Sequence, residues 1–206
     1  MSAGWLWVRV PSGPLEESLN FPLFFYKNYM KTLHINLWAG PGTGKSTMAA
    51  GIFAALKWNK IDCELVSEYA KQIVWEESYT KLNNQIYLFG KQYSKHYNLE
   101  GKVQVVITDS PIPMGCVYDD GRTKYLKELV ISEFHKFDNL NYFLGRVKDY
   151  NPNGRMQTYE EALEKDREIK DFMIENEIEY IGIPAEEESI KLIVEDIKRK
   201  LSYETV

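Results

Sequence analysis

The stretch AGPGTGKST, residues 39–47, decides the fold of this 206-residue chain. A short β-rich run, TLHINLW at residues 32–38, comes immediately before it. After it, residues 48–58 (MAAGIFAALKW) place their apolar side chains at helical spacing. The sequence therefore predicts a strand, a glycine-rich loop and a helix in direct succession.

This loop has the residues that a polyphosphate site requires. Because a polyphosphate carries several negative charges, its site needs inward N–H groups, a helix N-terminus and a flexible cation. Lys45 would reach the β- and γ-phosphates, the Ser46 hydroxyl would bind magnesium, and Thr47 would face the α-phosphate. We expect ATP and Mg²⁺ as ligands. The expected nucleotide-binding residues are Gly40, Pro41, Gly42, Thr43, Gly44, Lys45, Ser46 and Thr47.

The loop departs at one position from the usual phosphate-binding pattern, GxxxxGK[ST]. Ala39 stands where that pattern has its first glycine. Alanine adds a single methyl group and Gly40 follows directly, so we expect phosphate binding to be kept. The geometry at the start of the loop is left open.

Composition favours one domain and a small partner. With 44% hydrophobic and 27% charged residues the chain can bury one good core, and a single α/β domain is expected. The net charge of -5 gives no bulk attraction for nucleic acid or anionic lipid, although a local basic patch can still bind phosphate. Cys63 and Cys116 lie far apart, which indicates reduced thiols in a cytoplasmic protein. We expect a monomer or homodimer.

Residues 1–29 differ from the rest of the chain. They combine tryptophans, prolines and an aromatic cluster without helical or strand periodicity, and they precede a second methionine, Met30. They contain no clear signal peptide, and no apolar run is long enough for a membrane span. We expect a domain over residues 30–206, preceded by a non-domain extension, with Met30 as the native start.

Strands and helices alternate beyond the loop. Further strands are predicted at 63–67, 103–108, 140–144 and 178–183. Helices are predicted at 68–75, 83–97, 123–137, 158–176 and 186–201, the fourth opened by a capping box of Thr158 and Glu161. Five strands separated by helices predict a parallel sheet covered on both faces, a three-layer α/β/α fold.

Several classes of nucleotide-binding protein are disfavoured by what surrounds the loop. Residues 59–62 (NKID) match the guanine-reading NKxD pattern but fall before the second strand, where that pattern does not belong. Ring ATPases usually follow the acidic residue of the third strand with glutamate, whereas Ser110 and Pro111 follow Asp109 here. Phosphate transfer to a small acceptor fits better. The alternative is an AAA-type ATPase or an ATP-dependent regulatory switch acting on a macromolecule.

Two carboxylates follow predicted strands at the edge where doubly wound folds bind ligands. Glu68 comes directly after the second strand and can orient an acceptor hydroxyl or take its proton; the alternative is that it caps the helix it opens. Asp109 ends the third strand and is expected to hold magnesium together with Ser46.

Cations and aromatic side chains complete the candidate site. Arg146 and Arg155 flank a polar loop after the fourth strand, from which a lid can close over the phosphates, and their planar forks suit phosphate oxygens. Lys148 and Arg122 are weaker candidates of the same kind. Side chains that can frame an acceptor, or pack as ordinary core, are Tyr69, Gln85, Tyr87 and Tyr93.

The order of these motifs resembles the nicotinamide riboside kinase-like branch of P-loop kinases, an AAA-type ATP-binding group. After AGPGTGKST come LVSEYAKQ, NNQIYLFGKQ, VVITDSP and YNPNGRMQTYEEA, so the resemblance covers about residues 31–201. It implies a sheet of order 2-3-1-4-5, ATP as donor and a nucleoside or nucleotide acceptor near Glu68. Ser110 stands where many such kinases carry arginine. The acceptor therefore stays open between nicotinamide riboside, a deoxynucleoside, a nucleoside monophosphate and a modified base in a polynucleotide.

Overall fold

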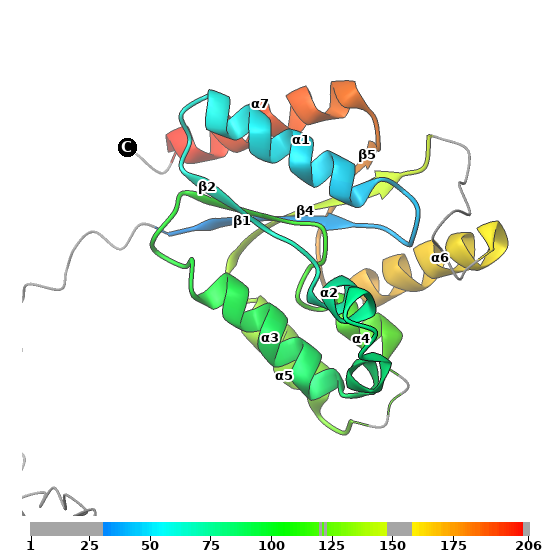
Figure 1. Ribbon diagram of the computed structural model, residues 1–206. Coiled ribbons are helices and arrows are strands. Elements are labelled where there is room, and N and C mark those ends of the chain that lie inside the picture. The colour runs from blue at the N-terminus through cyan, green and yellow to red at the C-terminus, as the bar shows by residue number, and fades with distance from the viewer. Residues whose placement is uncertain (1–30, 120, 122, 148–157, 204–206) are drawn as a thin grey trace, which may run out of the picture.

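The computed structural model describes residues 31–119, 121, 123–147 and 158–203. The predicted extension 1–29 lies outside this part of the chain, as do Arg122, Lys148 and Arg155. The described residues form a five-stranded parallel sheet of order β2-β3-β1-β4-β5, with helices on both faces (Figure 1). The predicted three-layer fold and strand order are confirmed.

The elements follow the predicted succession closely. The strands are β1 (Leu33–Trp38), β2 (Cys63–Val66), β3 (Val105–Thr108), β4 (Asp138–Gly145) and β5 (Ile181–Pro184). The helices are α1 (Lys45–Trp58), α2 (Tyr69–Trp75), α3 (Gln85–Tyr97), α4 (Met114–Tyr118), α5 (Leu126–Phe134), α6 (Tyr159–Glu175) and α7 (Glu187–Tyr203), with a 3-10 turn, η2 (Tyr79–Asn83). The prediction missed η2 and α4, which are too short to carry a helical period.

The centre of the sheet is β1, all six residues of which are buried. It pairs in parallel with β3 through Leu33 and Val105, and with β4 through Leu33 and Asp138. A parallel strand covered on both faces needs apolar side chains on both, which explains the unbroken apolar character of β3. The glycine-rich loop therefore follows the central, fully buried strand of the sheet.

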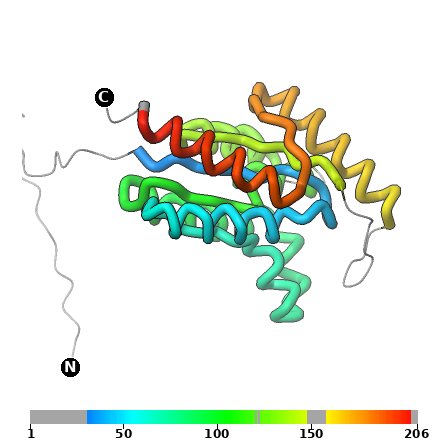
Figure 2. The backbone as a smooth tube through the Cα atoms, turned by 90° about the horizontal axis from the view of Figure 1, so that it is seen from above, coloured from blue at the N-terminus to red at the C-terminus, as the bar shows by residue number. Residues whose placement is uncertain are grey.

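The two larger hydrophobic cores of the described residues lie on opposite faces of the sheet. On one face α1 and α7 run side by side, as Figure 2 shows from above, and Ile52 of α1 shares a core with Ile193 of α7. On the other face Trp38, Phe134 and Ile169 belong to a core formed with α4, α5 and α6. No helix among the described residues is long and apolar enough to cross a membrane.

The predicted capping box at the start of α6 is present. The Glu161 backbone N–H donates to the Thr158 hydroxyl at 3.2 Å, and the Thr158 N–H donates to the Glu161 carboxylate at 2.7 Å. Two otherwise unpaired N–H groups are thereby satisfied, which fixes where α6 begins. From there α6 runs beside the carboxyl edge of the sheet, next to the loop that follows β1 (Figure 1).

Candidate active site

The loop between β1 and α1 has the geometry of an anion site. Gly44 caps α1 with φ of 105°, and Gly42 has φ of 86°, both in the left-handed region that glycine enters without strain. The N-terminus of α1 points its free N–H groups and the positive end of its dipole into this loop. Strand, loop and helix are thus arranged as the sequence predicts.

Lys45 is folded back over the loop. Its Nζ donates to the carbonyl oxygen of Ala39 at 2.7 Å and to that of Gly40 at 2.9 Å. Burial lowers the pKa of Lys45 to about 8, against the attraction of Glu68, Asp109 and other nearby carboxylates. The ammonium group is therefore held at the phosphate loop, near carboxylates that come from several different segments of the chain.

Ser46 and Asp109, the two residues expected to hold magnesium, lie in contact. The Ser46 hydroxyl donates to Asp109 Oδ2 at 2.5 Å, and Asp109 Oδ1 accepts the Glu68 N–H at 3.2 Å. No group of three or more His, Cys, Asp or Glu side chains gathers for a metal in the described part of the chain. A hydroxyl and one carboxylate fit Mg²⁺, because that ion takes few protein oxygens and completes its shell with water and substrate phosphates.

Glu68 stands between the loop and a pocket. It is the N-cap residue of α2, yet its side chain makes no capping hydrogen bond, so capping does not account for the carboxylate. Burial raises the pKa of Glu68, and Asp109 raises it further, while Lys45 lowers it. The positive charge of Lys45 acts on the Glu68 carboxylate, and Glu68 also lines the pocket.

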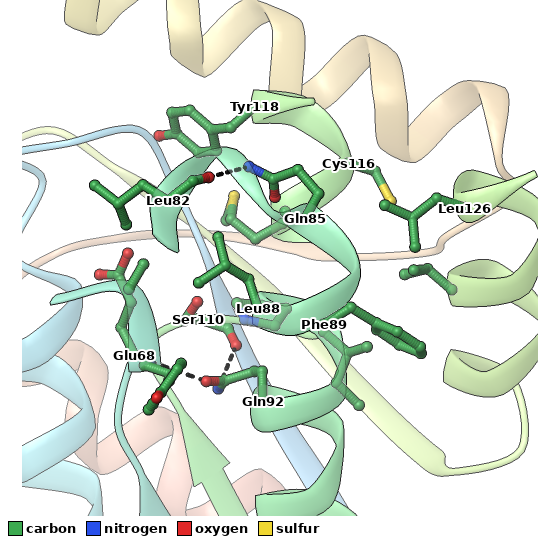
Figure 3. A pocket seen from close by; sticks show the side chains of 17 residues that line it. Glu68, Leu82, Gln85, Leu88, Phe89, Gln92, Ser110, Cys116, Tyr118 and Leu126 are labelled. Atoms are coloured by element: carbon green, nitrogen blue, oxygen red, sulfur yellow. Dashed lines mark hydrogen bonds between the residues drawn. The ribbon is translucent and has the colours of Figure 1, made fainter. Parts of the chain in front are cut away.

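The pocket beside Glu68 has a volume of about 290 Å³. Its walls come from α2, η2, α3, α4 and α5 and from the segment after β3, and they are mostly apolar (Figure 3). Leu88 and Phe89 of α3 belong to these walls, whereas Gln85 and Gln92 bring amides from the same helix. An apolar cavity with a few polar groups is the usual form of a small-molecule site.

The amides of the pocket are oriented by the backbone. Gln92 accepts the Tyr69 N–H at 3.1 Å and donates to the Ser110 carbonyl at 3.1 Å, which ties the segments after β2 and β3 together. Gln85 donates to the Leu82 carbonyl at 3.0 Å, and Figure 3 shows this contact on the side of Tyr118. Both side chains therefore have fixed directions before any ligand binds.

The structure divides the predicted acceptor residues. Tyr69 and Gln85 line the pocket. Tyr87 is absent from its lining, and its hydroxyl lies 2.7 Å from that of Tyr69. Tyr93 donates to Glu133 at 2.8 Å and packs against Phe137, so it belongs to the packing of α3 on α5.

Sequence reasoning missed Gln92, Tyr118 and Asp166. Gln92 lies two helical turns after Gln85, and this spacing on one helix face was a usable signal. Tyr118 belongs to the unpredicted α4, and its pKa is raised to about 12 by burial and by Glu68 among other carboxylates. No sequence signal marked Asp166, which reaches the loop from α6, more than a hundred residues later in the chain.

Arg146 follows β4 as predicted, but its guanidinium is already engaged. Its Nε donates to Asp166 at 2.5 Å and its Nη2 donates to the Ala162 carbonyl at 3.2 Å. Asp166 also accepts the N–H of Gly40 at 2.5 Å. Arg146 therefore lies at the phosphate loop, held there by α6. Arg155 was predicted to act beside it and lies outside the described residues.

Fold and loop together define a P-loop nucleotide-binding protein. Residues 34–189 match the family model described as AAA domain (AAA_28). The chain belongs to this AAA domain family. No curated protein sequence matches it.

The solved structures that share the fold include a deoxyadenosine kinase and the NadR protein. A deoxyadenosine kinase from M. mycoides, with the products dcmp and a flexible dcdp bound, has a TM-score of 0.52 and 22% identity over 82% of this chain and 99% of that one. The NadR protein in complex with NR has a TM-score of 0.52 and 14% identity over 74% of this chain. The chain spans 43% of that NadR structure. The chain thus shares the α/β fold of this deoxyadenosine kinase and of NadR.

Proposed function

We propose that the protein is an ATP-dependent phosphotransferase that moves the γ-phosphate of Mg-ATP to a hydroxyl group of a nucleoside-type acceptor. One observation carries the proposal. Glu68 lines the pocket, and its backbone N–H donates to Asp109, which accepts the hydroxyl of Ser46 in the phosphate loop. The phosphate loop and the pocket are therefore two halves of one site, as a transfer between two bound substrates requires.

Each residue has a distinct proposed role. Lys45 and the loop amides hold the polyphosphate and stabilise the charge on the transferring group. Ser46 and Asp109 would hold Mg²⁺, which neutralises charge on the phosphates when it is bound. Glu68 orients the acceptor hydroxyl and accepts its proton, so that the oxygen attacks the γ-phosphorus and ADP leaves.

Charge in the pocket favours an acceptor without phosphate. Among the described residues that line it, Glu68 carries the one formal charge. A nucleoside monophosphate would bring its dianion next to this carboxylate, and Ser110 offers a hydroxyl where an arginine would be needed. The structural neighbours are consistent with this, since the names of two of them refer to a nucleoside kinase and to a complex with NR.

Acceptor-dependent ADP release tests the proposal. Purified protein with Mg-ATP would be given nucleosides, deoxynucleosides, their 5′-monophosphates and a single-stranded oligonucleotide in parallel, with Lys45→Ala as the control for contaminating enzymes. We expect ADP release to require a nucleoside, and mass spectrometry to find the acceptor heavier by one phosphoryl group. Rapid ATP hydrolysis that ignores every acceptor would contradict the proposal.

A second candidate is an AAA-type ATPase or ATP-driven switch, and the family's description as an AAA domain favours it. The residue after Asp109 argues against it, because Ser110 cannot activate water as a glutamate would. The same assay separates the two. The ATPase predicts hydrolysis without acceptor, stimulated by a macromolecule or by self-association.

A further inference from the structure

A single peptide group at the start of the phosphate loop is held from both ends. The peptide that joins Ala39 and Gly40 presents its carbonyl oxygen to Lys45 Nζ at 2.7 Å. Its N–H, on Gly40, points the other way and donates to Asp166 Oδ1 at 2.5 Å. The orientation of this peptide therefore sets the position of the carbonyl oxygen that accepts the hydrogen bond from Lys45. The hydrogen bond to Asp166 fixes that orientation.

Asp166 is itself held by a second partner. Its other oxygen accepts Arg146 Nε at 2.5 Å, and Arg146 Nη2 reaches the Ala162 carbonyl one turn earlier on α6. The two side chains are 11% and 14% exposed, so the pair is shielded from solvent. A charge-assisted contact of this kind is stronger than a surface ion pair and is geometrically specific.

Close approach at this point explains the unusual start of the loop. A Cβ on Gly40 would lie 2.7 Å from Asp166 Oδ1 and 2.9 Å from the Ala162 carbonyl oxygen. That carbonyl belongs to the α6 backbone and cannot move aside cheaply. Ala39, by contrast, turns its methyl group into the core beside α1 and is 1% exposed. The residue that must be glycine is the one that α6 touches, one place after the usual position.

The groove beside the loop carries more negative than positive side chains. Glu161, Glu164, Lys165 and Glu168 of α6 line it together with Pro41 of the loop, and Lys165 pairs with Glu168. An uncompensated carboxylate at Asp166 would add to this charge right beside a bound polyphosphate, where partial burial weakens solvent screening. Arg146 removes that penalty by pairing with it.

We propose that Asp166 is a positioning residue of the nucleotide site, holding the Ala39–Gly40 peptide in the orientation that receives Lys45, and that Arg146 serves to neutralise Asp166. This rests on the nucleotide half of the proposed function and not on the acceptor. Arg146 thereby acts on the phosphates through Asp166 instead of gripping them as a lid arginine would.

Nucleotide binding without any acceptor tests the inference. The dissociation constant of a non-hydrolysable Mg-ATP analogue would be measured by calorimetry for the wild type, Asp166→Ala, Asp166→Asn, Arg146→Ala and the double variant Arg146→Ala/Asp166→Asn. We expect Asp166→Ala to weaken binding about tenfold, because a charged hydrogen bond to the loop is lost. Asp166→Asn recovers part of this, since its amide oxygen still accepts the Gly40 N–H.

The double variant decides what Arg146 does. Arg146→Ala alone leaves the Asp166 carboxylate unpaired and weakens binding, whereas adding Asp166→Asn removes that charge and restores affinity. If Arg146 contacts phosphate itself, the second substitution brings no recovery, and the inference is overturned. Wild-type affinity in Asp166→Ala would overturn it as well.

A matched control separates positioning from a general effect on α6. Asp171→Asn makes the same chemical change at an exposed position of that helix, and we expect wild-type affinity from it. Asp166→Asn leaves the largely buried Arg146 without its carboxylate, so it should unfold at a lower temperature than Asp171→Asn. Both affinities are therefore measured at a temperature where each variant is fully folded. Equal affinities in these two variants would contradict a positioning role. Because no acceptor is present, a failure of the kinase proposal leaves this result unaffected.

Discussion

Polar groups are buried at both ends of the central strand β1, but those at one end lie beside a pocket and those at the other are packed in the core. At the carboxyl end of β1, Lys45 and Asp109 lie at the N-terminus of α1, and Glu68, whose N–H donates to Asp109, lines a pocket. At the amino end, His34 of β1 meets His96 of α3, with 3.1 Å between their Nδ1 atoms, and Glu100 lies 2.9 Å from His34 Nε2. Both clusters contain a strongly shifted pKa, so such a shift does not by itself mark a functional site.

What differs is what the groups face. The ring of Phe137 lies 4.5 Å from that of His34 and 6.2 Å from that of His96, centre to centre, so the histidines are packed against an aromatic wall. Burial lowers the pKa of His96 to about 3 and keeps it neutral. At the carboxyl end, Glu68 instead lines a pocket that a substrate can fill. Access, together with convergence on one point, separates a candidate active site from a polar core.

The sharpest test of this contrast is to remove Lys45. Because the ammonium group serves the phosphates, we expect Lys45→Ala to lower kcat by about a thousandfold. Burying the Lys45 ammonium group is unfavourable in the protein without nucleotide, so removing it should not destabilise the fold. The thermal unfolding temperature of the variant should therefore stay near that of the wild type. Steady-state kinetics and calorimetric unfolding measure the two effects. A variant that keeps full turnover would show that the phosphate has been misplaced.

Glu68 tests the other half of the same site. We expect Glu68→Gln to lower kcat by about a hundredfold or more, since the amide can orient a hydroxyl but accepts no proton at neutral pH. The dissociation constant for Mg-ATP should change little, because the carboxylate serves the acceptor. Rapid-quench kinetics with saturating ATP measures the chemical step. A loss of nucleotide affinity with unchanged kcat would instead place Glu68 on the phosphate side.

The reach of the sequence differs between these two halves. The phosphate loop, Ser46 and Asp109 were predictable, because a local motif and the ends of buried parallel strands fix their places. The sheet order came from the family resemblance, since spacing along the chain does not choose neighbours. Asp166 was out of reach, because its role depends on how α6 packs against the loop. Arg146 was located correctly, yet its partner could not be foreseen for the same reason.

Separate substitutions of the first two loop residues test whether the packing of α6 sets the requirement for glycine. Gly40→Ala brings a methyl group against the Ala162 carbonyl, and we expect Mg-ATP to bind about tenfold more weakly as the loop shifts. Ala39→Gly restores the usual motif but removes a buried methyl group, so it should cost about 1 kcal/mol of unfolding free energy and leave nucleotide binding intact. Calorimetry and urea unfolding would distinguish the two. Equal binding defects would mean that the motif, and not α6, sets the requirement.

The last effect is expected at the amino end and concerns stability alone, with no change in activity. His96 has a pKa of about 3 in the folded protein and about 6.5 when unfolded. At pH values between these two pKa values, His96 is protonated in the unfolded chain and neutral in the folded protein. The unfolding free energy attributable to His96 therefore falls with decreasing pH, by about 1.4 kcal/mol per pH unit once well below 6.5.

Substituting His96 with asparagine should remove this dependence. We expect wild-type protein to lose more unfolding free energy than His96→Asn between pH 7.5 and about pH 5 in urea titrations. His135→Asn, at an exposed position, should retain the wild-type slope. Kinase activity at pH 7.5 should be the same in all three proteins, because His96 lies at the opposite end of the sheet from Glu68. A drop in kcat confined to His96→Asn would show that the histidine cluster affects catalysis. It would contradict the assignment of that cluster to the polar core alone.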